Sequence, residues 1–253
     1  MTLFSTDFKT ISLKQVIGLI VAVNLAVFIF LNIAARFLTD TQWIDELFLD
    51  SDVPFHLWSL ATYSFCHISF SHMIVNMTVL ILAGFIIETK SIKKLTAKNV
   101  AAIYLASALG GGIAFLVSPH HSNVLIGASA AVMGLAGALA VACYKTSVTL
   151  PFPGRINLMT LIFILLAWVL IATSTTSPET TIVHSAGLAT GILTFALLSL
   201  FQRYKSYHSR SCEQSNFERL NLKVRTSGYA SLNDEERYLL LNHNQNQANQ
   251  ESL

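Results

Sequence analysis

Two segments decide the interpretation of this chain: Gly127-Ala128-Ser129-Ala130 and His184-Ser185-Ala186-Gly187-Leu188-Ala189-Thr190-Gly191. Each lies near the start of an apolar stretch long enough to cross a bilayer, for which about 20 residues are needed. A polar side chain at membrane depth is costly unless it has a partner. We therefore expect Ser129 and His184 to lie together, in a place where water is scarce.

The composition is that of a polytopic membrane protein. Of the 253 residues, 53% are hydrophobic and only 12% are charged, whereas charged residues make up about 25% of a soluble domain. Six apolar stretches predict six spanning helices, at residues 16–38, 62–87, 100–117, 126–144, 156–173 and 182–201. We expect an all-α membrane domain over residues 1–201 and a cytoplasmic tail over residues 202–253.

The positions of Lys and Arg predict the orientation, because these residues concentrate in cytoplasmic segments. They occur before the first stretch, after the second and fourth stretches, and in the tail. The links after the first, third and fifth stretches hold none, and Arg36, at the end of the first stretch, is the exception. Both termini are therefore expected in the cytoplasm. The first link is acidic and aromatic, which fits a partly inserted interfacial loop and a solvated loop equally well.

The tail is polar and is interpreted as a region of its own. Residues 231–241 predict one short helix, with Asn233 as its N-cap and Glu236 at the capping-box position. The Asn/Gln-rich residues 244–250 are typical of a disordered end.

The polar residues of the spans exclude several kinds of catalytic site. All 14 acidic residues lie in loops, tails or span ends, so the spans hold no pair of aspartates. No His-Glu-x-x-His motif of a zinc protease is present either. The polar residues of note are His67, His72, Asn76, Ser129 and His184. They come from the second, fourth and sixth stretches, which run in the same direction through the membrane.

These residues can converge near one end of the bundle. His72 and Asn76 are four residues apart and share a helix face. Small residues such as Gly187 and Gly191 let two membrane helices approach closely, although the same spacing also fits a generic packing seam. A histidine base activates a serine nucleophile. The unpaired N–H groups of a helix start, together with His72 and Asn76, would stabilise an oxyanion.

In these residues the chain resembles the rhomboid intramembrane serine proteases. The resemblance covers residues 58–191 and rests on three blocks: residues 58–88 with His67, His72 and Asn76; Gly127-Ala128-Ser129; and His184-x-x-Gly187-x-x-x-Gly191. It implies a six-helix bundle with Ser129 as nucleophile and His184 as general base. It further implies His72, Asn76 and the Ser129 backbone as the oxyanion site, with His67, Gly127, Gly187 and Gly191 in supporting roles.

The resemblance also implies the partners. Substrates would be single-pass or other transmembrane proteins, cut near the outer face of the bilayer, and the location a bacterial plasma (inner) membrane. No cofactor, metal or nucleic acid is expected. The chain departs from the family pattern at Ser59 after Trp58, at Ala130 and at Met133.

Two other functions remain open. The first is a non-catalytic membrane chaperone or binding protein on the same fold, which would need none of Ser129, His184, His72 and Asn76. The second is a metal site of His67, His72 and His184, which no carboxylate or thiol would join.

Overall fold

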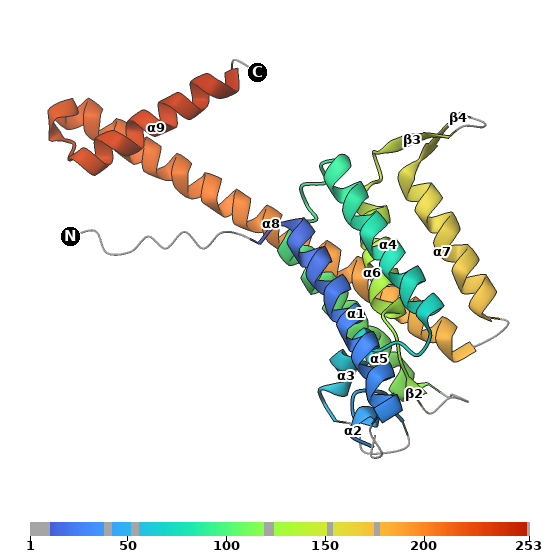
Figure 1. Cartoon of the computed structure of the whole chain (residues 1–253). Coiled ribbons are helices and arrows are strands. Elements are labelled where there is room, and N and C mark those ends of the chain that lie inside the picture. Colours follow the sequence, from blue (N-terminus) through green and yellow to red (C-terminus); the bar gives the residue numbers. More distant parts are fainter. Residues whose placement is uncertain are drawn as a thin grey trace. The chain divides into compact units, whose positions relative to one another are not determined.

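The computed structural model describes residues 11–37, 42–51, 56–118, 124–150, 154–174 and 178–251. The chain divides into two compact units, Met1–Leu197 and Leu198–Leu253. The sequence analysis places this division after residue 201. The two units are described separately, and Figure 1 labels the elements of both.

The first unit is built from apolar helices. Four helices contain segments long and apolar enough to cross a membrane: α1 (Leu13–Phe37), α4 (Phe70–Thr89), α5 (Ala97–Val117) and α8 (Pro178–Ser227). Two further apolar helices are shorter, α6 (Ser129–Ala142) and α7 (Leu158–Ser174). The prediction of a helical membrane protein is confirmed, whereas six complete spans remain a prediction.

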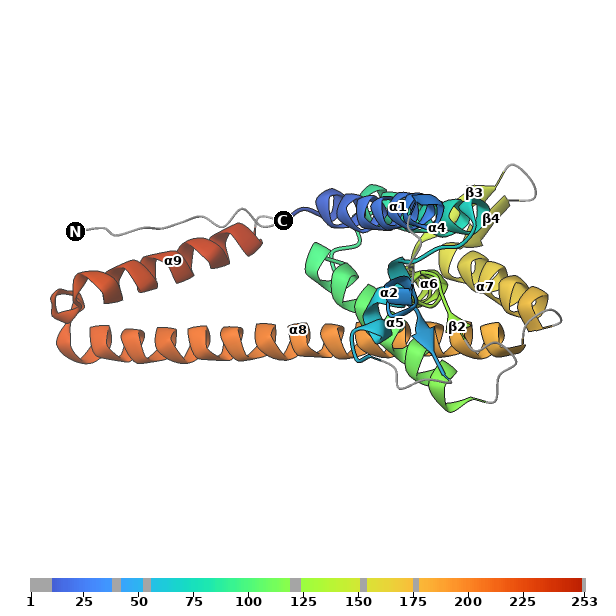
Figure 2. The ribbon, with the colours of Figure 1, turned by 60° about the horizontal axis from the view of Figure 1, so that its bottom comes forward.

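Helix α6 forms the interior of this unit. Every residue from Ala130 to Ala140 is buried, and α4, α5 and α7 all pack against the helix. Figures 1 and 2 show α6 among the other helices in both orientations. The alanines and glycines of α6 make it thin, so its neighbours lie close to its backbone.

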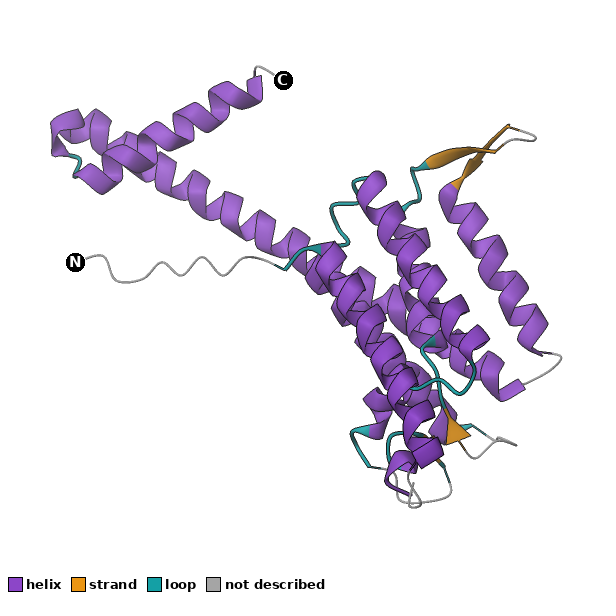
Figure 3. Cartoon of the chain, in the orientation of Figure 1, coloured by secondary structure: helices purple, strands orange, loops and turns teal. Residues whose placement is uncertain are grey.

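Short elements connect the long helices. Between α1 and α4 the chain forms α2 (Gln42–Asp45), β1 (Leu49–Asp50), α3 (Ser59–Thr62) and the 3₁₀ helix η1 (Tyr63–Phe65). Two antiparallel strand pairs are present: β1 with β2 (Val124–Leu125), and β3 (Ser147–Leu150) with β4 (Gly154–Asn157). The second pair stands out in orange in Figure 3. In the first pair, Leu49 lies opposite Leu125. This pair joins the first link to the segment that enters α6.

Three helix boundaries differ from the prediction. The second apolar stretch was predicted to be helical from residue 62, but α4 begins at Phe70, after the N-cap Ser69, whose hydroxyl accepts the His72 N–H at 3.2 Å. The fourth helix begins at Ser129 rather than at residue 126. The sixth helix continues beyond residue 201, since α8 ends only at Ser227.

The second unit is a helical hairpin. The last part of α8 is followed by η2 (Tyr229–Ser231) and α9 (Asp234–Glu251). Its core contains Leu220, Leu232 and Leu240, packed with Phe217 and Val224. Helix α9 extends to Glu251 and includes the Asn/Gln-rich residues that the sequence analysis expects to be disordered.

The predicted capping box closes the start of α9. The Glu236 N–H donates to the Asn233 side-chain oxygen at 2.8 Å, and the Asn233 N–H donates to the Glu236 carboxylate at 3.1 Å. Lys223 of α8 donates to the same carboxylate at 2.7 Å. Two hydrogen bonds lower the pKa of Glu236 below its ordinary value: the one from Lys223 has the larger effect, and the one from Asn233 is next. The carboxylate thus joins both arms of the hairpin.

Candidate active site

The site begins at the turn that enters α6. Gly127 has a φ of 120°, in the region that favours glycine. Its N–H donates to the Tyr63 carbonyl at 3.0 Å. A Cβ on Gly127 would lie 2.6 Å from Cε1 of His72, so the imidazole packs directly against this glycine. Gly127 is therefore needed for its backbone conformation and for the room it leaves to His72.

His67 fixes the same turn from the other side. The side chain is buried, and its Nε2 lies 3.4 Å from the Ala128 N–H donor and 3.4 Å from the Asn76 amide nitrogen. Its ring is 5.2 Å from the His72 ring, centroid to centroid. Since Nε2 accepts the Ala128 N–H, His67 acts as a positioning residue for the segment before Ser129. The resemblance implies a structural or water-retaining role for this histidine, and these contacts are structural.

Ser129 is the first residue of α6, with Ala128 at the N-cap position. The Val132 N–H is bonded to the Ala128 carbonyl at 2.9 Å. The N–H groups of residues 129–131 precede it and have no acceptor within the helix. They form the positive end of the helix dipole. The half-buried Ser129 hydroxyl thus lies beside donors that suit an anionic oxygen.

Glycines bring α8 against α6. The Cα of Gly187 lies on the Ala130 backbone, and the Cα of Gly191 lies on the Gly134 backbone. The two helices therefore run parallel and in register over one turn. His184 precedes Gly187 by three residues, and Ser129 precedes Ala130 by one, so both lie at the same end of the contact. The predicted close approach of the two helices is present.

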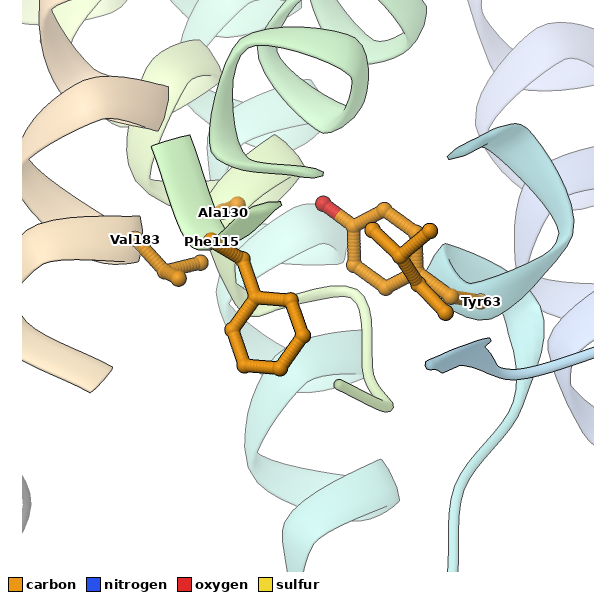
Figure 4. Close-up of a cluster of buried hydrophobic side chains, with 5 residues drawn as sticks. Tyr63, Phe115, Ala130 and Val183 are labelled. Atoms are coloured by element: carbon orange, nitrogen blue, oxygen red, sulfur yellow. The ribbon is translucent and has the colours of Figure 1, made fainter. Parts of the chain in front are cut away.

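A cluster of buried apolar side chains fixes this end of the contact. Ala130, Val183, Tyr63 and Phe115 pack together with Leu49, and Figure 4 shows the labelled members gathered around Ala130. The Tyr63 hydroxyl donates to the Ala108 carbonyl at 2.7 Å. Because Ala130 follows Ser129 and Val183 precedes His184, the cluster fixes the neighbours of both polar residues. The sequence analysis counts Tyr63 among the apolar residues of a span and misses this role.

The hydrogen bond expected between Ser129 and His184 is not formed among the described residues. His184 is buried, and in the described part of the chain neither of its ring nitrogens has a hydrogen-bond partner. The Asn76 amide donates to the His72 carbonyl at 3.1 Å and faces His67, so it is engaged within its own surroundings. Catalytic hydrogen bonds are often long before substrate binds. The structure therefore places Ser129 and His184 at one site without a hydrogen bond that joins them.

His72 and Met133 also have defined surroundings in the structure. His72 lies at the Gly127 turn, with its ring packed against the glycine. Met133, one of the departures from the family pattern, packs with Leu166 of α7 and with Leu188. Among the described residues, no group of three or more His, Cys, Asp or Glu side chains could hold a metal ion.

Apolar helices of spanning length, packed through glycines around a serine and histidines at one end, define an integral membrane protein with a polar site between its helices. The family model described as Rhomboid domain matches residues 54–201. This match covers more than half of the chain, which therefore belongs to the rhomboid family. No curated protein matches the chain. Members of this family are usually intramembrane serine proteases, and the family also includes inactive members.

Proposed function

We propose that this chain is an intramembrane serine endopeptidase that cuts transmembrane proteins near the outer face of the membrane. The contact of Gly187 and Gly191 with the α6 backbone carries the proposal, because it brings His184 and Ser129 to the same end of two helices. The proposal includes six spans, cytoplasmic termini and a bacterial plasma (inner) membrane as the location.

The reaction follows from the roles of these residues. The Ser129 hydroxyl attacks the scissile carbonyl while His184 takes the hydroxyl proton. The oxyanion that forms is stabilised by the N–H groups at the start of α6 and by donors from His72 and Asn76. His184 then gives its proton to the leaving amine, and a water molecule releases the acyl group from Ser129 by the same steps. The carboxylates nearest to the spans lie at the span ends and not in their interiors, so the proposed unit is a dyad.

Labelling with a fluorophosphonate probe in membranes tests the proposal. The wild-type chain should be labelled and should cleave a single-pass reporter protein. Ser129→Ala should abolish both signals, and His184→Ala should abolish cleavage. Ser185→Ala is the matched control, since Ser185 lies next to His184 but is exposed on α8. Labelling that persists in Ser129→Ala would overturn the assignment of the nucleophile.

Within the described residues, neither ring nitrogen of His184 has a hydrogen-bond partner, which favours one alternative, a non-catalytic chaperone or binding protein for membrane helices. Such a protein would bind the reporter without cutting it. Its binding would be the same in wild type and in Ser129→Ala. An uncleaved reporter that is retained equally by both would support this alternative.

A further inference from the structure

A cavity of about 410 Å³ lies beside the proposed catalytic residues. Its walls come from four parts of the first unit: the loop before α4, the end of α5, the β2 segment and the first turns of α8. Ile126 and Val183 both line it. Ile126 is three residues before Ser129, and Val183 directly precedes His184. A peptide bond held at Ser129 therefore has this cavity as a neighbour.

Six of the eight described residues that line the cavity are apolar, and the other two, Glu179 and Thr180, are polar. The apolar residues include Ile68, Phe115, Leu125 and Val183. Figure 4 shows Phe115 and Val183 next to each other in the cluster around Ala130. Surfaces of this kind hold the methylene stem of a long side chain. The volume falls in the range of roughly 300–1,000 Å³ that is usual for ligand pockets.

Glu179 gives the cavity its charge. It is half-buried in the first turn of α8, and among the described residues it is the only charged side chain that lines the cavity. In the part of the chain that the structure describes, Glu179 forms no ion pair, although five other ion pairs are present. A carboxylate in a first turn also interacts favourably with the helix dipole. That interaction accounts for Glu179 on the helix but not for its place in a cavity beside Ser129.

We propose that this cavity binds a Lys or Arg side chain of the transmembrane substrate, close to the scissile bond, with the cationic head at Glu179. The inference rests on the proposed function. Lys and Arg side chains combine an apolar stem with a charged tip, which matches apolar walls that carry one carboxylate. An anionic lipid headgroup would be repelled by the same carboxylate.

This preference would make the protein selective. Lys and Arg are uncommon at the outer ends of membrane helices, because they concentrate on the cytoplasmic side. A cavity that favours them at the outer end would admit a small part of the membrane proteins around it.

A set of matched reporters tests the inference. A Gln is placed in turn at each of several positions on either side of the cleavage site, and each Gln is then replaced by Lys or by Glu. For each position, kcat/KM is expressed relative to the Gln reporter, so that every enzyme variant has its own baseline. In the wild type, one position should favour Lys over Glu by about fivefold, as expected of a partly exposed ion pair.

Variants of Glu179 should change this preference. Glu179→Gln should remove it, and Glu179→Lys should reverse it in favour of the Glu reporter. Glu46→Gln is the matched control, because Glu46 is an exposed acidic residue of the first link that faces His56. It should keep the wild-type preference.

Binding separates this inference from the proposed function. The affinity of the Lys, Gln and Glu reporters for Ser129→Ala in micelles should show the same order without catalysis. A wild type that cuts no reporter would overturn the proposed function, and an order of affinity that follows charge would still support the cavity. Equal kcat/KM and equal affinity for the three reporters at every position would overturn the inference about Glu179.

Discussion

Gly187→Ala tests the packing that brings the two proposed catalytic residues together. A Cβ at this position would lie 2.8 Å from the Ala130 carbonyl carbon and 2.9 Å from its Cα, whereas ordinary contacts begin at 3.4 Å. The opposing atoms are backbone, so they cannot rotate away. Helix α8 must therefore move from α6 by several tenths of an ångström at the level of the site.

The magnitude follows from this displacement. Overpacking of a close contact costs about 1–3 kcal/mol, so the free energy of unfolding should fall by about 2 kcal/mol. A misplacement of about 1 Å in a catalytic constellation costs about a hundredfold in rate, and the smaller shift here should cost about tenfold. Unfolding by SDS titration, followed by circular dichroism, measures the first quantity, and reporter cleavage measures the second.

Two companion variants make the result decisive. A Cβ at Gly18 of α1 would meet nothing within 4 Å, so Gly18→Ala should leave cleavage unchanged. Gly191→Ala meets the Gly134 backbone one turn further from the site, so it should lower stability as much but cleavage less. Equal stability and equal cleavage in Gly187→Ala and Gly18→Ala would refute the reasoning.

Three further predictions concern other parts of the molecule. Gly127→Ala should lower cleavage at least tenfold, because it strains a positive φ by about 1–3 kcal/mol and displaces the His72 ring; wild-type turnover would show that this turn does not position the site. His72→Ala and Asn76→Ala should each reduce turnover by about 10²–10³-fold while Ser129 still reacts with the probe, and unchanged turnover in both would place the oxyanion elsewhere. The hairpin of α8 and α9 should loosen in acid: the lowered pKa of Glu236 means that its contribution is complete above the ordinary carboxyl pKa and is lost as the pH falls through the lowered value. Hydrogen exchange of α9 in the full chain, corrected for intrinsic rates, should show this loss; Glu236→Gln should remove the dependence on pH, and Lys223→Ala should reduce it, because the Asn233 N–H still donates to the carboxylate.

The parts of the site that can be predicted are those that depend only on residues a few positions apart in the sequence. Gly187 and Gly191 are four residues apart and face one helix, so their contact with α6 could be inferred from the sequence. The end of α8 can also be predicted from the sequence, because no Gly or Pro occurs between Gly191 and Gly228. Gly228, with a φ of 79°, follows the last helical residue.

The remaining features depend on partners distant in the sequence. Residues 63–68 precede α4 and belong to the same apolar stretch of sequence. Nothing in this sequence shows that the chain is extended at Cys66 before the helix begins. The positive φ of Gly127 is coupled to His72 and Tyr63, which belong to another part of the chain. Strands of two residues, such as β1 and β2, are too short to show an alternating pattern.

If the proposed function holds, the pairing of β1 with β2 gives the protein a point of inhibition away from the proposed active site. Leu125, which lies opposite Leu49, is two residues from Gly127, so a displacement of the first link is passed directly to the turn that holds Ser129. An antibody fragment that binds residues 42–51 and pulls β1 from β2 would shift the proposed nucleophile without itself occupying the proposed site. Because Leu125 also lines the cavity proposed to hold a substrate side chain, such an agent would lower kcat and raise KM, which is the behaviour of a mixed inhibitor.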